Sequence, residues 1–573
     1  MTTSGGLLLV LAVLMPFAGV LAGLVLGGRH AERIALATLL AGLVLALAIA
    51  DGWMRAGGAL VYLLGGWAPP LGIALRADGL SVVMLLAVAV VICGIGAYAR
   101  ADFATPAGMR EARAPFTFWL LLLAVWGSLN LVFVSGDLFT LYVALELLTF
   151  AGVALVCLDG RGETLRAALR YLLYALLGSV FYLLGAVLLY GAYGTLDIAL
   201  LAARVRPEPV AWAAAALMTV GLLAKTALFP LHLWLPPAHA GAPAAASAVL
   251  SALVVKGSWF LVVRLWFDVM PGVITLPAAQ LLGALGAAAI VVGSIVALRQ
   301  ARLKLLIAYS TLAQIGYLFL MFPLAFDPAT GQLEPGGALA GGLLQAVSHA
   351  TAKAAMFMAA GSIYLALGHD RITGLAGVAR ILPISVLAFA LGGVALMGVL
   401  PSGAYLAKKL LLDAADGTGQ AWLALVLQGG GVLTCGYVVL VLVHALRRPA
   451  SPVVLQKPVP RLQQAATLML ALCSLLLAGA AFGPLPRSLL SNPFAPGELA
   501  SLLLVVLGGC ALAWGLGTHG SDGAGAAINP LRRAALAVGG LCVRMDGVLR
   551  QWPVAGLSLL VLALLFGAAM AAS

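Results

Sequence analysis

The chain has 573 residues, of which 63% are hydrophobic and only 9% are charged. An average soluble domain carries about 25% charged residues, so this composition excludes a soluble globular protein. The six cysteines are isolated and none belongs to a CxxC pair, so the sequence offers no ligand set for zinc or an iron–sulfur cluster and no disulfide framework. We expect no metal site, no cofactor and no catalytic residue.

Apolar stretches of about 18 or more residues predict membrane-spanning helices, because the hydrocarbon core is about 30 Å thick and an α-helix rises about 1.5 Å per residue. Such unbroken runs exclude a strand barrel, so the predicted fold class is an all-α polytopic membrane protein. The first run follows a segment without basic residues, which argues against a cleaved signal peptide. In chain order, the sixteen predicted spans are residues 4–26, 34–51, 78–99, 115–135, 137–157, 171–194, 210–229, 243–267, 275–298, 304–324, 337–367, 383–413, 422–445, 463–483, 499–517 and 553–571.

The net charge of +12 is spread over short loops rather than gathered in one patch, which argues against a nucleic-acid partner. If the N-terminus lies outside, the predicted cytoplasmic loops contain 21 Lys and Arg residues and the external loops contain five. Because cytoplasmic loops are enriched in Lys and Arg, this asymmetry predicts a multi-pass protein of the bacterial inner membrane with its N-terminus outside. The five external residues are Arg55, Arg76, Arg204, Arg206 and Arg487.

A few charged residues fall inside predicted spans, where each costs roughly 2.5–3.5 kcal/mol on insertion scales. They are Glu146, Lys225, Lys256, Lys353 and one of the neighbours Lys408 and Lys409. One interpretation is a set of buried ion pairs that lock helices together, but it leaves at least three lysines without a deep acid. The other, which we favour, is a hydrated polar axis along which protons or sodium ions move.

Two of these charges are suited to form a switch. If Glu146 lies beside Lys225, the carboxylate holds the lysine proton when it is close and releases it when it swings away. Arg264 lies near the end of its span, and we expect its side chain to extend outward to water.

Prolines interrupt two of the lysine-bearing spans. Pro230 follows Lys225 by five residues, and Pro401 lies shortly before Lys408. Proline inside a span breaks the helical hydrogen bonding, and transporters use discontinuous helices to form ion sites. A kink that serves only helix packing is the alternative for either proline taken alone.

Three histidines accompany these residues. His349 lies four residues before Lys353, hence on the same helix face, and is suited to relay protons at physiological pH. His232 and His239 flank the proline-rich segment of the first interrupted span and are candidates for a cytoplasmic access path.

Spans four to eight and nine to thirteen form two groups of five, and an odd number of spans makes the second group enter the membrane from the opposite face. In each group the fourth span is the interrupted one that carries a lysine. This is the layout of inverted-topology repeats, although the two groups share little direct identity. The predicted domains are 1–114, an N-terminal three-helix segment; 115–270, the first five-helix repeat; 271–446, the second, inverted repeat; and 447–573, a C-terminal extension with about three helices.

Six segments carry a family resemblance. They are GGWAPPLGIALRADGLS (65–81), GDLFTLYVALELL (136–148), LLAKTALFPLHLWLPPAHAGAPAAASAVLSALVVK (222–256), RLKLLIAYSTLAQIGYL (302–318), SHATAKAAMFMAAG (348–361) and GVLPSGAYLAKKLLL (398–412). In this order they resemble the antiporter-like subunits shared by respiratory complex I, membrane-bound hydrogenases and Mrp-type multisubunit cation/proton antiporters, over about residues 60–445. The first and fourth segments are most similar to the D-type member of the Mrp antiporters, whereas LPSG departs from the commoner double-proline form.

The resemblance implies two inverted five-helix bundles and proton transfer through a glutamate of span 5 and lysines of spans 7, 8, 11 or a neighbour, and 12. These positions correspond to Glu146, Lys225, Lys256, Lys353 and Lys408. It also implies partner membrane subunits, to which any quinone or NADH chemistry of an NADH:quinone oxidoreductase-type or hydrogenase-type complex would belong.

We therefore predict a proton-translocating, antiporter-like membrane subunit of a multisubunit ion-pumping complex. The alternatives are a subunit of a Mrp-type Na⁺/H⁺ antiporter and a relative that energises another process such as inorganic carbon uptake. The intact set of buried charges disfavours a non-conducting scaffold, and no dinucleotide fingerprint or haem-ligand pair supports redox chemistry in this chain. The tail, with a Gly/Ala-rich linker at 521–527 and a basic stretch at 530–550, packs along a neighbouring subunit, lies at the cytoplasmic interface or adds an anchor.

Overall fold

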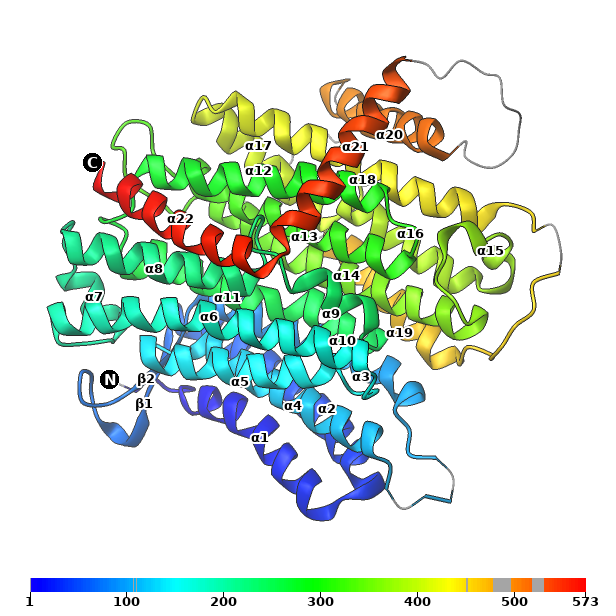
Figure 1. The fold of residues 1–573 in the computed structure, drawn as a ribbon. Helices are drawn as coiled ribbons and strands as arrows, with labels where there is room; N and C mark the ends of the chain where they lie inside the picture. Colours follow the sequence, from blue (N-terminus) through cyan, green and yellow to red (C-terminus); the bar gives the residue numbers. More distant parts are fainter. Residues whose placement is uncertain are drawn as a thin grey trace.

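The computed structural model describes residues 2–106, 108–109, 111–449, 452–477, 496–517 and 530–572. Almost all of its secondary structure is helical, and most of the long helices run side by side in one bundle (Figure 1). In the described part of the chain, fourteen helices are long and apolar enough to cross a membrane, and Pro383–Leu396 and Arg461–Leu476 are shorter apolar helices. The predicted all-α polytopic membrane fold is confirmed.

The N-terminal segment contains three spanning helices and a small hairpin. Helices α1 (Leu7–Leu26) and α2 (Gly28–Ala56) pack on each other and are followed by the antiparallel strands β1 (Leu60–Leu63) and β2 (Ala74–Ala77), with the short helix η1 (Leu64–Gly66) between them. Helix α3 (Gly79–Asp102) is preceded by its N-cap Asp78, whose carboxylate accepts a hydrogen bond from the Ser81 N–H.

The first half of the core contains one interrupted span. Helix α8 ends at Thr226, the chain turns without helix through Pro230, and α9 begins at Leu235. The elements are α4 (Arg113–Val134), α5 (Leu138–Val156), α6 (Gly162–Tyr193), α7 (Ile198–Arg204), α8 (Pro209–Thr226), α9 (Leu235–Gly241), α10 (Ala244–Val249), η2 (Leu250–Val254), α11 (Val255–Val263) and η3 (Arg264–Val269). The run from α10 to η3 is one buried span that contains two π-helical segments, a type of irregularity frequent at functional sites.

The second half contains the other interrupted span. Helix α16 ends at Leu396, and α17 begins at Gly403 after a non-helical segment that includes Pro401. The elements are α12 (Leu276–Leu298), α13 (Leu303–Leu324), α14 (Gly337–Leu367), η4 (Ile372–Gly374), α15 (Val378–Ile381), α16 (Pro383–Leu396), α17 (Gly403–Gly417) and α18 (Ala421–Leu446). Helices α13 and α14 are almost wholly covered by other helices, so they form the centre of the bundle with the α10–η3 run.

The C-terminal extension wraps around this bundle. Its helices are α19 (Arg461–Leu476), α20 (Pro496–Gly517), α21 (Pro530–Leu549) and α22 (Trp552–Ala571). Helix α19 packs on α3, α14 and α16, whereas α22 packs on α8 and α12, and α21 crosses the bundle diagonally against α12 (Figure 1). The predicted linker at 521–527 and the external Arg487 lie outside the described residues.

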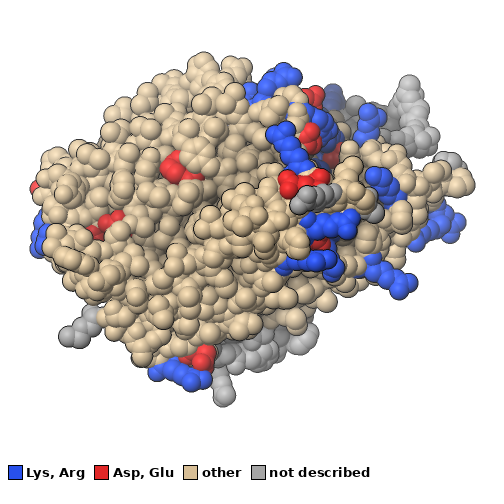
Figure 2. All heavy atoms as spheres, turned by 90° about the horizontal axis from the view of Figure 1, so that it is seen from below, with Lys and Arg blue, Asp and Glu red and all other residues tan. Residues whose placement is uncertain are grey.

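The distribution of surface charge divides the molecule along the helix direction. Figure 2 shows a broad face with few charged side chains, with Lys and Arg gathered mainly at one end of the bundle. A wide surface without charges is the kind of surface that a lipid bilayer covers.

Candidate functional site

Glu146 of α5 and Lys225 of α8 form a buried pair. The Lys225 Nζ lies 3.0 Å from the Glu146 Oε1 and donates to the Thr149 Oγ1 at 2.8 Å. The Ser179 hydroxyl of α6 also donates to the Glu146 Oε1, whereas the buried Oε2 has no hydrogen-bond partner among the described residues. The side chains of Lys225 and Glu146 are only 6% and 13% exposed, so the pair is shielded from water except for a narrow exposure at the glutamate.

The end of α8 explains why Lys225 is held there. Ala227 adopts a left-handed conformation (φ 60°), and the N–H groups of Ala227 and Leu228 bond back to the carbonyls of Ala224 and Leu223. This C-terminal capping pattern leaves Lys225 in the last helical turn, where the helix dipole favours a positive charge. The indole of Trp234 donates to the carbonyl of Ala224 and ties the chain beyond the break to the same turn.

Lys256 lies in the π-containing span at the centre of the bundle. Its Nζ donates to the carbonyl oxygen of Ser251 at 2.6 Å, and the Ser251 hydroxyl is 2.9 Å from the Thr311 hydroxyl of α13. Lys256 is 1% exposed, and the neighbours named here, Ser251 and Thr311, carry no charge. Among the described residues, the polar contact of the Lys256 amine is therefore to a neutral carbonyl oxygen.

Lys353 of α14 is in a similar environment. Its Nζ donates to the carbonyl of Ile307 at 3.2 Å and to the hydroxyl of Ser310, both on α13. His349, one helical turn away, is within electrostatic reach of both Lys256 and Lys353, and its ring nitrogens have no hydrogen-bond partner among the described residues. A buried imidazole without partners, placed near two lysines, has free lone-pair and proton positions for a relay.

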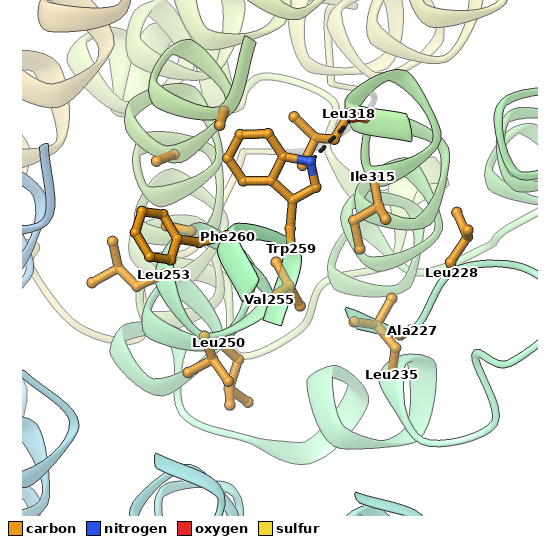
Figure 3. Close-up of a cluster of buried hydrophobic side chains, with 14 of the residues drawn as sticks. Ala227, Leu228, Leu235, Leu250, Leu253, Val255, Trp259, Phe260, Ile315 and Leu318 are labelled. Carbon is orange, nitrogen blue, oxygen red and sulfur yellow. Dashed lines mark hydrogen bonds between the residues drawn. The ribbon is translucent and has the colours of Figure 1, made fainter. Parts of the chain in front are cut away.

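The elements that carry Lys225 and Lys256 meet in a polar contact and an apolar cluster. The Thr226 hydroxyl of α8 donates to the Ser258 hydroxyl of α11 at 2.9 Å. Ala227 and Leu228 follow the end of α8, and Val255 and Trp259 flank Lys256 in sequence (Figure 3). These side chains pack with Ile315 and Leu318 of α13, and the Trp259 indole donates to the Leu318 carbonyl at 3.1 Å (Figure 3).

Two glutamines that the sequence interpretation did not single out extend the polar line beyond Lys353. Gln345 of α14 donates to the Gln314 Oε1 of α13 at 3.0 Å, and both are buried. Gln345 and Lys408 line the same internal cavity of about 10 Å³, which is close to the room needed by one water molecule. The sequence signal was available, since amides in the middle of apolar spans need a partner.

The structure distinguishes the two neighbouring lysines of α17. Lys408 is 8% exposed and faces the cavity beside Gln345. The Lys409 Nζ lies 3.6 Å from the Glu498 Oε1 at the start of α20. Lys408 is therefore the lysine that faces the polar line, and Lys409 binds the C-terminal extension.

An open cavity of about 1120 Å³ lies at the end of the bundle where α3, α6, α9, α10 and α13 meet. We call it the basic vestibule, because four arginines and two lysines line it together with three acids. The basic residues are Arg161, Arg166, Arg170, Arg302, Lys304 and Lys457, and the acids are Asp102, Asp159 and Glu163. His239 lies directly before the lining residue Ala240, is fully buried, stacks on Phe357 and is within electrostatic reach of Lys304 and Lys353.

His232 differs from the loop residue that the sequence suggested. It is fully buried, and its Nε2 lies 2.9 Å from the Asp546 Oδ1 of helix α21. Asp546 lies in the basic stretch of the tail, where no sequence pattern connects it to a histidine 314 residues away.

Arg264 is held by carboxylates rather than extended freely to water. Its guanidinium makes two bonds of 2.6 Å to the two Asp78 oxygens and one of 2.7 Å to Asp268, and the side chain is 13% exposed. Burial raises the pKa of Asp78, but the hydrogen bonds and charge of Arg264 and the Ser81 N–H outweigh this and hold the pKa below its usual value. The cluster joins α3 to the end of the α10–η3 span.

Comparison with known families identifies the chain. The family described as NADH:quinone oxidoreductase/Mrp antiporter, transmembrane region, matches residues 135–434, which is more than half of the chain. The chain belongs to this family. The matched region begins before α5 and ends within α18, so it contains Glu146 and all the buried lysines described above.

Relatives come from several kinds of complex. The chain is 33% identical to the N subunit of the NADH-quinone oxidoreductase of Desulforudis audaxviator, over 80% of this chain and 90% of the relative. It is 28% identical to the D subunit of the Na(+)/H(+) antiporter of Alkalihalophilus pseudofirmus, over 76% of this chain and 86% of the relative. It is also 28% identical to the N subunit of the F(420)H(2) dehydrogenase of Methanosarcina mazei, over 54% of this chain and 63% of the relative.

Solved structures share the fold. A chain of the Mrp complex from Dietzia sp. DQ12-45-1b superimposes with a TM-score of 0.73 at 23% identity, covering 90% of this chain and 98% of that chain. A chain of the archaeal membrane-bound sulfane sulfur reductase gives a TM-score of 0.73 at 24% identity, covering 88% and 99%. Both are chains of membrane complexes. The family match and these shared folds together confirm the predicted antiporter-like membrane subunit.

Proposed function

We propose that this chain translocates protons through the buried residues Glu146, Lys225, Lys256, His349, Lys353 and Lys408. The observation that carries the proposal is that Lys225, Lys256, Lys353 and Lys408 are all buried, and that the last three contact neutral oxygen atoms or line a small cavity. Lysine in such surroundings can exchange a proton with neighbouring polar groups, whereas a structural role requires a paired charge.

The route begins at the basic vestibule. His239 connects the vestibule to the centre of the bundle, because it adjoins the lining and is within electrostatic reach of Lys353. His349 links Lys353 with Lys256, and Gln314, Gln345 and the small cavity continue from the Lys353 region to Lys408. In this proposal the vestibule faces the cytoplasm of a bacterial cell, and the N-terminus lies outside.

The Glu146–Lys225 pair acts as the switch of the route. While the pair is closed, the carboxylate stabilises the protonated amine; when it opens, the proton can leave toward Lys256. In this proposal the apolar side chains that pack beside these elements (Figure 3) limit the entry of water, which prevents a continuous leak.

The chemistry of the buried groups favours protons over sodium ions. Sodium prefers carboxylate, carbonyl and water oxygens, and ammonium groups repel a cation, yet four lysines and a single glutamate form the interior of this route. The second candidate is a subunit of a Mrp-type Na⁺/H⁺ antiporter, which the 28% identity to an antiporter protein favours. In either case we propose that other membrane subunits, surrounded by lipid, complete the complex.

The proposal is tested by proton flux in sealed vesicles that contain the native complex. Lys225→Ala and Glu146→Gln should abolish most of the flux while the complex still assembles, because each removes one half of the switch. Glu334→Gln removes an exposed carboxylate and is the matched control, which should keep normal flux. Normal flux in assembled Lys225→Ala would show that the pair only joins helices.

A further inference from the structure

The C-terminal helix α21 places one carboxylate inside the bundle. Hydrophobic side chains on this helix, such as Leu541 (59% exposed) and Val548 (50% exposed), remain on its surface. Asp546 is only 2% exposed, so the single acid of this helix is turned inward. A carboxylate in that position needs several donors to offset the loss of water.

Three side chains supply these donors. The Asp546 Oδ1 lies 2.9 Å from the His232 Nε2, and the Oδ2 accepts hydrogen bonds from the Tyr309 hydroxyl at 2.8 Å and from the Arg550 Nε at 2.9 Å. Tyr309 belongs to α13 and His232 to the break after α8. Asp546 therefore joins three parts of the chain that lie far apart in sequence.

The contacts of His232 fix the number of protons at this site. Its Nδ1 lies 3.2 Å from the carbonyl oxygen of Pro230, which can only accept, while its Nε2 faces the carboxylate. A neutral imidazole has one N–H and cannot donate at both positions. Both contacts are satisfied when the site holds one additional proton, either as imidazolium with carboxylate or as imidazole with carboxylic acid.

The hydrogen bonds to the carboxylate place that proton on the histidine. Tyr309 and Arg550 both donate to the Asp546 Oδ2, which favours the ionised carboxylate. Burial raises the pKa of Asp546, but the hydrogen bond and charge of His232, the charge of Arg550 and the bond from Tyr309 outweigh it and hold the pKa below its usual value.

We propose that Asp546 and His232 form a buried carboxylate–imidazolium pair by which α21 fixes the break after α8 and the Tyr309 turn of α13 in one arrangement. Lys225 lies seven residues before His232, and Ser310, which contacts Lys353, directly follows Tyr309. The pair makes Asp546 a positioning residue for two lysine groups at once. Its effect on transport rests on the proposed proton route, whereas the existence of the pair does not.

The direct test is the charge state of His232 in the native complex, reconstituted in lipid bilayers and labelled with ¹⁵N in the histidine rings. One of the seven histidines should show an imidazolium signal at pH 8 that disappears in His232→Gln and in Asp546→Asn. Asp546→Glu keeps a carboxylate and should keep the signal. His444, whose Nδ1 also faces a carbonyl, is the matched control, and His444→Gln should leave the signal unchanged.

Two results would overturn the pair: a neutral His232 ring at pH 8 in the wild-type complex, or an imidazolium signal that survives in Asp546→Asn. The wild-type spectrum decides the question even where a variant fails to assemble. The positioning role is tested separately by proton flux. Asp546→Asn should lose most of its flux, whereas Asp546→Glu, which keeps a carboxylate, should retain most of it.

If the proton flux of Asp546→Glu falls as much as that of Asp546→Asn, the positioning role is contradicted. The loss would then indicate only a defect in packing. If Lys225→Ala conducts normally while the imidazolium signal is present, the proposed route fails and the pair stands. The two ideas are therefore separable by experiment.

Discussion

The Glu146–Lys225 pair predicts a measurable coupling energy. With side chains 13% and 6% exposed, the two charges are too shielded for the small energies of surface salt bridges to apply. Removing one partner of a buried pair leaves an uncompensated charge and typically costs about 3–5 kcal/mol. We therefore expect Glu146→Gln and Lys225→Met each to lower the free energy of unfolding by about 3–5 kcal/mol.

The double variant is the informative comparison. With both charges gone, the site loses only polar contacts, so the double variant should be destabilised by clearly less than the sum of the two single variants. The assay is reversible unfolding of the purified chain in mixed micelles, with the four proteins of the cycle measured in parallel. Single variants that each lie within about 1 kcal/mol of the wild type would refute the burial argument, because this is the range of a solvated pair.

Three further predictions concern other parts of the molecule. Gln345→Leu should slow proton flux without preventing assembly, because it removes the amide between Gln314 and the cavity beside Lys408; flux equal to wild type would exclude this route. Arg264→Ala should lower the free energy of unfolding by about 1–3 kcal/mol, since Asp78 loses both guanidinium bonds. Because the pKa of Asp78 is lowered in the folded state, the pair stabilises the protein above the unfolded pKa near 4, and this stabilisation is lost as the pH falls through the lower folded value. The difference in the free energy of unfolding between Arg264→Ala and wild type should therefore shrink in acid. A difference that stays constant with pH would contradict the assignment. His239→Gln should reduce proton uptake from the vestibule side, measured with vesicles of defined orientation, and an unchanged uptake rate would remove His239 from the route.

The membrane fold was predictable because it depends on local composition. Each long apolar run must satisfy its own backbone hydrogen bonds in lipid, which only a helix can do, so hydropathy alone locates the spans. The breaks at Pro230 and Pro401 follow from the missing proline N–H in the same way. The span 383–413, predicted to be interrupted at Pro401, consists of the two shorter helices α16 and α17.

The candidate site was predictable only in part. Charged side chains in the middle of a span are costly and therefore rare, so Glu146 and the lysines were identifiable from the sequence. The distances between these side chains were not. The Gln314–Gln345 contact, the Lys409–Glu498 pair and the Asp546–His232 pair join residues between 31 and 314 positions apart. No local periodicity encodes such contacts, because they depend on how the helices pack.

His232 illustrates the difference. A histidine in a proline-rich segment between helices normally lies at the surface, and no pattern around it predicts a fully buried ring. Its Nε2 contacts α21, a helix of the tail for which the sequence left three positions open: along a neighbouring subunit, at the cytoplasmic interface or as an added anchor. The tail thus contributes a contact to the core that the segments of family resemblance do not contain.

The most direct test of the account is proton flux through the native complex in sealed vesicles after Lys353→Met. Lys353 is fully buried at the centre of the bundle, and among the described residues its amine contacts neutral oxygens of α13 and forms no ion pair. The account predicts an assembled complex with almost no flux, while Arg55→Met, a change at an exposed position far from the buried lysines in sequence, leaves flux normal. Wild-type flux in an assembled Lys353→Met complex would contradict the proposal that protons pass along the buried lysines.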